Sequence, residues 1–417
     1  MITNPAAALF VILAIAFLSP IAAQLVHRWR VPGLVFEIAL GIIAGPAILN
    51  FVTLSAPVEL FANLGLASLI FLAGLELDPT RISGRPIRLA MVGWGISIAL
   101  GLLFAFALSQ FGVIKTELFV AFALTTTALG TLLPILRDTG LGSTRLGTHV
   151  LAIGSVGEFG PILAVALVLS GASPSRSVAS LAIFVVVAII GLLVTRRVRS
   201  ERLVRFFHST LRTSGQLHTR LAVLLVAGMT LLAGELGLDF LLGAFTAGIL
   251  FRIFLNVSTD EHDRNAVETK IEAISYGYLI PVFFVVTGMT FDLDSLISSP
   301  AALLKLPLFL VLFFVVRGVP MLLYRRAVPK RSDRVGLACL SATALPLVVA
   351  ICAIGVATRQ MYPSTATALI GAGMCSIVLG PLLGLRLLGT DDETGKGPGN
   401  ATATGNTGHA VRTEVAE

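Results

Sequence analysis

The sequence contains thirteen runs of mostly apolar residues. The length of each run is close to the roughly 20 residues that a helix needs to cross a bilayer. Hydrophobic residues make up 56% of the sequence and charged residues 13%, which lies outside the range of soluble domains. The sequence therefore predicts an all-α, polytopic membrane protein of about 13 transmembrane helices. The runs cover residues 6–26, 32–51, 57–77, 88–110, 117–136, 147–170, 177–195, 220–236, 238–256, 277–291, 301–323, 336–356 and 364–386.

The basic residues between these runs predict how the chain is oriented. If the amino terminus lies outside, the other side of the membrane carries Arg28, Arg30, Arg81, Arg85, Arg137, Arg145, the arginines of 196–220 and those of 325–334. The outer side then carries only Lys115, Arg176, Lys305 and Arg359. By the positive-inside rule the carboxyl terminus is cytoplasmic, and the net charge of +7 reflects topology rather than nucleic-acid binding.

Three pairs of motifs indicate an internal repeat. "EIALGIIAG" (37–45) resembles "DFLLGAFTAG" (239–248), "FLAGLELD" (71–78) resembles "VVTGMTFD" (285–292), and "TTTALGTLLP" (125–134) resembles "SATALPLVVA" (341–350). The matched runs cross the membrane in opposite directions, so the two halves form inverted repeats, as in many secondary transporters.

This repeat sets the predicted domains. Residues 1–195 hold the first repeat and a linker run, and residues 220–387 hold the second repeat. An Arg-rich cytoplasmic connector (196–219) joins them, a second polar connector covers 257–276, and residues 388–417 form a disordered tail whose composition supports no core.

Two matched runs carry threonine and proline at mid-membrane. Pro134 and Pro346 each remove the helical partner of a carbonyl four residues earlier, beside Thr125, Thr126, Thr127 in one run and Thr343 in the other. One interpretation is an ordinary proline kink in which the threonine hydroxyls bond back to their own helix. The matched depth and the repeat favour the other, a pair of broken helices that cross, because unpaired backbone is tolerated only inside protein or along a cavity.

One carboxylate lies near the membrane midplane. Glu158, in "GSVGEFGPIL" (154–163), is about 17 Å along its run, where an acid costs at least ~2.5–3.5 kcal/mol and usually faces a cavity. Pro161 frees the carbonyl of Gly157, and Gly154, Gly157 and Gly160 smooth one strip of the helix for close approach. A carboxylate, freed carbonyls and threonine hydroxyls suit a hard monovalent cation, and a proton competes for the same buried group. The alternative is a protonated structural glutamate bonded to a neighbouring helix.

At these residues the chain resembles the monovalent cation:proton antiporter 2 family. The segments "VPGLVFEIALGIIAGP" (31–46), "FLAGLELD", "LGAFTAG" (242–248) and "IPVFFVVTGM" (280–289) are similar to the signatures of its second, third, ninth and tenth helices. The resemblance implies the sodium/proton antiporter fold, with crossed helices five and twelve, a dimerisation part and a mobile core part. It also implies a homodimer in a bacterial inner membrane, and a helix-six carboxylate that carries ion and proton alternately.

Glu158 falls at the position of that carboxylate, with two departures from the family pattern. The family usually has Asp preceded by Asn, Gln or Asp, whereas Glu158 follows Gly157. The lysine that the electrogenic branch carries on helix ten is absent, which indicates one proton against one cation.

Three further charges lie within the runs. Arg317 is in the inner third of its run, at a depth similar to Glu76. Relatives commonly keep a basic residue on this helix to pair with a core acid, and the alternative is a side chain that extends to the inner surface. Glu37 either lines a cytoplasmic funnel or sits at the membrane interface.

These features predict an exchanger of Na⁺ or K⁺ against H⁺ that works by alternating access. It needs no cofactor, its partners are membrane lipids and a second copy, and no nucleotide-binding domain is expected, since no strand with a Gly-rich phosphate signature follows residue 387. A polytopic membrane enzyme would require a nucleophile, base or metal cluster near one face, and a channel would require symmetric polar rings, against which the inverted repeat argues.

Overall fold

The computed structural model describes residues 4–25, 33–52, 54–76, 84–168, 174–197, 215–258, 261–297 and 300–388. Residues 198–214 of the predicted connector 196–219, and the predicted tail beyond residue 388, lie outside these residues.

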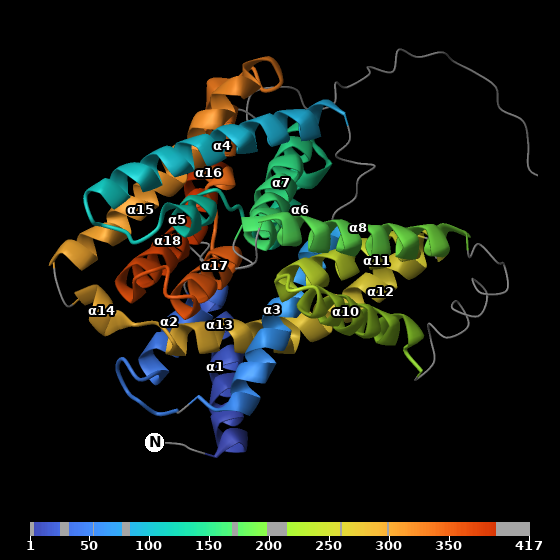
Figure 1. Cartoon of the computed structure of the whole chain (residues 1–417), viewed down its shortest axis with the longest axis horizontal. Helices are drawn as coiled ribbons and strands as arrows, with labels where there is room; N and C mark the ends of the chain where they lie inside the picture. Colours follow the sequence, from blue (N-terminus) through green and yellow to red (C-terminus); the bar gives the residue numbers. More distant parts are fainter. Residues whose placement is uncertain are drawn as a thin grey trace, which may run out of the picture.

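Helices account for every long element of the described chain (Figure 1). The first half contains α1 (Pro5–Leu25), α2 (Gly33–Ala44), α3 (Ala56–Glu76), α4 (Arg85–Gln110), α5 (Glu117–Leu124), α6 (Leu129–Asp138), η2 (Leu141–Ser143), α7 (Arg145–Val168) and α8 (Pro174–Arg197). The second half contains α10 (Leu217–Glu235), α11 (Phe240–Ser258), α12 (Glu261–Ile274), η3 (Ser275–Leu279), α13 (Ile280–Met289), α14 (Leu293–Ile297), α15 (Pro300–Gly318), η4 (Val319–Arg326), α16 (Arg331–Ser341), α17 (Pro346–Ala357) and α18 (Pro363–Leu388).

The predicted spans are confirmed as helices. Among the described residues, eight helices are long and apolar enough to cross a membrane, and α16 with α17, bent by 40°, makes a ninth. The shorter apolar helices Gly33–Ala44, Glu117–Leu132, Ala179–Gly191 and Phe240–Asn256 correspond to the remaining runs. Counted together, the long helices, the bent pair and the shorter apolar helices agree with about 13 spans. The exact number depends on which short or bent helices are counted as one span.

The helices form two groups (Figure 1). One group, which we call the core group, contains α4–α7 and α15–α18. The other, which we call the scaffold group, contains α1–α3 and α10–α13. Helix α8 packs on α11 of the scaffold group and on α7 of the core group, so it lies between the two.

Glycines from the repeated motifs bring the scaffold helices together. A Cβ added to Gly74 of α3 or to Gly248 of α11 would overlap a carbonyl oxygen of the partner helix. Gly41 of α2 and Gly288 of α13 meet in the same way. Helix α3 thus packs on α11 as α13 packs on α2, which is the pattern expected when inverted repeats relate α2 to α11 and α3 to α13.

The connector over 257–276 is largely helical, because α12 fills most of it and continues through the π-helical turn η3 into α13. Glu268 of this helix pairs with Arg252 of α11 and with Arg264 one turn earlier. Val267 and Ile271, one helical turn apart, are buried. This short apolar stripe, together with the ion pair, favours a helix despite the polar composition.

Candidate functional site

Two helices break near the centre of the core group, and the breaks contact each other. Residues 125–128 separate α5 from α6, and residues 342–345 separate α16 from α17. The Ala128 N–H donates to the Thr343 carbonyl at 2.7 Å, and the Thr127 hydroxyl donates to the Ser341 carbonyl at 2.6 Å. The predicted crossing of broken helices is confirmed.

The first break does not lie where proline predicts it. Pro346 begins α17, so the second break directly precedes it, but Pro134 lies inside α6 and the first break comes earlier. The hydroxyls of Thr125 and Thr126 donate to carbonyls three residues earlier, at 2.9 and 2.8 Å. These bonds satisfy the last carbonyls of α5, and the Thr127 hydroxyl instead crosses to the other break.

Helix α7 supplies acceptors for the first break. The Thr127 N–H donates to the Gly157 carbonyl at 3.0 Å, the group whose helical partner Pro161 removes. The Leu129 N–H donates to the Glu158 carboxylate at 3.2 Å. Because Leu129 begins α6, the carboxylate lies at the positive end of a helix dipole.

The Glu158 side chain is buried, with 4% of its surface exposed. Leu129 is the one hydrogen-bond donor that the described residues offer it. A carboxylate has about four lone-pair positions, so most of its acceptor capacity is unfilled. A buried acid in this state is stabilised by binding a proton or a cation.

Arg317 connects the two breaks to α4 and α7, and is 1% exposed. Its Nε donates to the Thr127 hydroxyl at 2.9 Å and to the Ser341 carbonyl at 3.3 Å. Its Nη1 and Nη2 donate to the Ser97 hydroxyl at 3.2 Å and the Ile153 carbonyl at 3.4 Å. The side chain therefore does not extend to the inner surface, and its partners among the described residues are hydroxyls and carbonyls rather than a carboxylate.

Gly157 makes this contact possible. An added Cβ would lie 2.6 Å from Nη2 of Arg317 and 2.7 Å from the Thr127 hydroxyl oxygen. Gly154 and Gly160 likewise admit a leucine of α6 and a tryptophan ring of α4. The glycine spacing predicts a strip of α7 that another backbone approaches closely. In the structure, side chains from three helices occupy this strip instead.

Of the other predicted residues, one lies at the crossing and two lie in the scaffold group. Thr343 is fully buried, its carbonyl belongs to the crossing, and its hydroxyl has no hydrogen-bond partner among the described residues. Glu37, 8% exposed, is on α2, and Glu76 is the last residue of α3, so both belong to the scaffold group.

Ser376 of α18 is a contributor that sequence reasoning missed. Its hydroxyl accepts the Ala344 N–H at 3.0 Å and lies 2.8 Å from the Gly373 carbonyl. The only available signal was a lone serine in an apolar run, and such serines often bond to their own helix. Ser97, which accepts from Arg317, escaped notice for the same reason.

Known proteins resemble this chain in sequence and in fold. The family model described as "Sodium/hydrogen exchanger, transmembrane" matches residues 13–385. The putative Na⁺/H⁺ antiporter YjbQ of Bacillus subtilis (strain 168) is 26% identical over 405 residues, which cover 93% of this chain and 64% of YjbQ. The glutathione-regulated potassium-efflux system protein KefC of Escherichia coli O17:K52:H18 is 30% identical over 312 residues, covering 70% of this chain and 47% of KefC. The chain thus spans less than two thirds of the length of these relatives.

A solved structure shares the fold. The sodium proton antiporter MjNhaP1 from Methanocaldococcus jannaschii superposes with a TM-score of 0.65 at 17% identity, covering 91% of this chain and 98% of that chain. At this identity the likeness concerns the fold alone, and it is the fold that the sequence predicts. Because the family model covers nearly all of the apolar runs, this multi-pass membrane protein belongs to the sodium/hydrogen exchanger family.

Proposed function

We propose that the chain is a secondary active transporter that exchanges Na⁺ or K⁺ for H⁺ by alternating access. The observation that carries the proposal is Glu158, a buried carboxylate with one hydrogen-bond donor, at the crossing of two broken helices. Family membership supports transport rather than enzyme chemistry. The names of YjbQ and KefC refer to sodium and to potassium, so the proposal covers both ions.

In this mechanism Glu158 binds a proton and a cation in turn. The hydroxyls of Thr125 and Thr126 give their protons to carbonyls, which leaves their oxygens free to accept. Oxygen atoms of this kind, together with the carboxylate, replace the hydration shell of a hard cation. A proton on Glu158 neutralises the same group, so the two ligands exclude each other.

The exchange is one proton for one cation. Glu158 is the only residue of the crossing that changes its charge in the cycle. Arg317 keeps its charge, because a guanidinium is not deprotonated at working pH and four acceptors surround this one. Each full cycle therefore moves no net charge.

Alternating access follows from the two helix groups. The core group carries Glu158 and moves as a unit against the scaffold group, with α8 as the connection between them. We place the protein in a bacterial inner membrane as a homodimer, with the amino terminus outside and the carboxyl terminus in the cytoplasm.

The test is Glu158→Gln in proteoliposomes that contain a pH dye, with Na⁺ and K⁺ gradients applied in turn. The amide keeps the side-chain volume but neither releases a proton nor neutralises a cation, so exchange should stop while the protein stays folded. Glu235→Gln, at the exposed end of α10, is the matched control and should keep the wild-type rate. Wild-type flux in Glu158→Gln would move the carrier role to another acid, with Glu76 the next candidate.

A further inference from the structure

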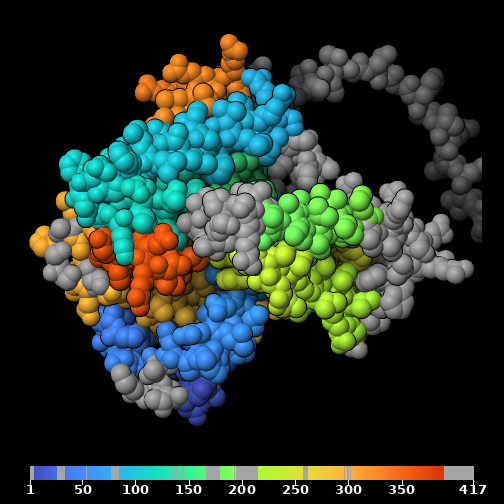
Figure 2. Space-filling view, viewed as in Figure 1, coloured from blue at the N-terminus to red at the C-terminus, as the bar shows by residue number. Residues whose placement is uncertain are grey.

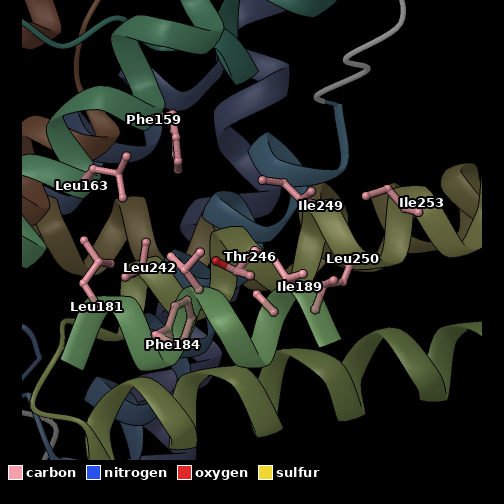
Figure 3. Close-up of a pocket in the computed structure, with 12 residues that line it drawn as sticks. Phe159, Leu163, Leu181, Phe184, Ile189, Leu242, Thr246, Ile249, Leu250 and Ile253 are labelled. Carbon is pink, nitrogen blue, oxygen red and sulfur yellow. The ribbon is translucent and has the colours of Figure 1, made fainter. Parts of the chain in front are cut away.

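A cavity of about 180 Å³ lies between α7, α8 and α11 (Figure 3). Twelve residues line it, and Thr246 of α11 is the only one with a polar side chain. Phe159, which directly follows Glu158, is among them. The cavity therefore offers no group that would hold an ion, and apolar cavities of this kind do not retain water.

The cavity is a long groove rather than a round pocket. Its lining residues run from Leu181 to Ile189 on α8 and from Leu242 to Ile253 on α11. At the helical rise these stretches measure about 12 Å and 16 Å. Figure 3 shows the two stripes side by side. A linear apolar molecule matches this shape.

Within the part of the chain that the structure describes, the groove opens toward the surroundings along α8. Val185 and Ile189 line it, and they are 43% and 47% exposed. Val186 and Ile190, on the outer face of the same helix, are 54% and 53% exposed. Figure 2 shows α8 at the molecular surface, beside α10. Because this helix lies in a membrane, the medium at the mouth of the groove is hydrocarbon.

We propose that this groove binds an acyl chain of a membrane phospholipid. The lining is apolar, the shape is linear, and the mouth faces the bilayer, so a lipid tail enters without passing through water. Each methylene buried from water is worth about 0.8 kcal/mol, but a tail that leaves the bilayer for the groove gains mainly from packing against fixed side chains. Retention of the lipid after extraction into detergent is therefore the property that identifies specific binding.

The position of the groove gives the lipid a role that rests on the proposed function. The Phe159 ring stacks on Phe245 of α11, with centroids 4.9 Å apart and an angle of 19° between the rings. This contact joins the helix that carries Glu158 to the scaffold group, and it must change when the core group moves. An acyl chain beside this ring contact is flexible, so it can adjust to the change in groove volume when α7 shifts.

The test uses the full chain reconstituted with a phospholipid that carries a diazirine in its acyl chain. After ultraviolet irradiation the protein is either analysed directly or first extracted and washed in detergent, and labelled peptides are located by mass spectrometry. We expect label on the groove face of α8 and on α11 to survive when the wash precedes irradiation. Label on the outer face of α8 should be lost.

Ala188→Phe fills the groove and should reduce the retained label about tenfold, because its ring takes the space of the acyl chain. Thr246→Leu is a smaller filling change that serves if Ala188→Phe does not fold. Val186→Phe, on the outer face of α8, is the matched control and should retain the wild-type label. Glu158→Gln should also retain it, which separates lipid binding from exchange.

Loss of all label from wild type on washing would overturn the proposal. Full retention in both filling variants would do the same, as would crosslinks that join the groove to a second copy of the chain.

Discussion

Gly157→Ala places one methyl group at the centre of the crossing. The added carbon would lie 2.6 Å from Nη2 of Arg317, 2.7 Å from the hydroxyl oxygen of Thr127 and 2.8 Å from its Cβ. Ordinary contacts of a Cβ begin near 3.4 Å. Either the guanidinium or the first break must therefore move by several tenths of an ångström, and both are held by hydrogen bonds.

The cost follows from what must move. Overpacking a filled interior typically costs about 1–3 kcal/mol. A hydrogen bond to a charged group contributes about 1.5–3 kcal/mol, and moving Arg317 weakens at least one of its four. We expect Gly157→Ala to destabilise the protein by about 2–4 kcal/mol. Exchange should fall as well, because Thr127 closely precedes the Leu129 N–H that binds Glu158.

The assay pairs thermal unfolding in detergent with cation-dependent proton flux in liposomes. Gly95→Ala is the matched control, because nothing lies within 4 Å of its added carbon and alanine is the better helix former. The control should melt at or slightly above the wild-type temperature and keep its rate. Equal melting temperatures and rates for the two variants would refute the claim that Gly157 sets the approach of Arg317 to the crossing.

Three further outcomes are expected. Ser376→Ala should lower stability by about 1–3 kcal/mol, because the Ala344 N–H loses its buried acceptor; an unchanged melting temperature would show that another group replaces it. Glu158→Asp should keep partial exchange with a higher KM for the cation, since the shorter side chain draws the carboxylate back from the Leu129 N–H, and a wild-type KM would argue against cation binding at that carboxylate. A diffusion potential imposed with an ionophore for the ion that is not transported should leave the initial rate nearly unchanged, and clear acceleration would contradict a one-for-one exchange.

The sequence by itself determined the environment and the general architecture. In hydrocarbon, the backbone of an apolar run of bilayer length can form all its hydrogen bonds only as a helix. The positions of the spans therefore follow from the pattern of apolar residues along the sequence. The cost of a midplane acid pointed to Glu158, and the local effect of Pro161 pointed to the Gly157 carbonyl, which accepts the Thr127 N–H. These inferences succeeded because each depends on a residue and its near neighbours in the chain.

Only the tertiary structure decided which distant groups meet. The first break precedes Pro134 because hydroxyls close α5 and the other break accepts the Ala128 N–H, a contact between residues far apart in the chain. Arg317 binds hydroxyls and carbonyls from four segments rather than an acid, and no local pattern distinguishes these partners. Helix α12 packs through the buried Val267 and Ile271, and its Glu268 pairs with Arg252 of α11, a residue of another helix. Hydropathy and propensity report the cost of placing one segment, whereas hydrogen-bond partners depend on how all the segments pack together.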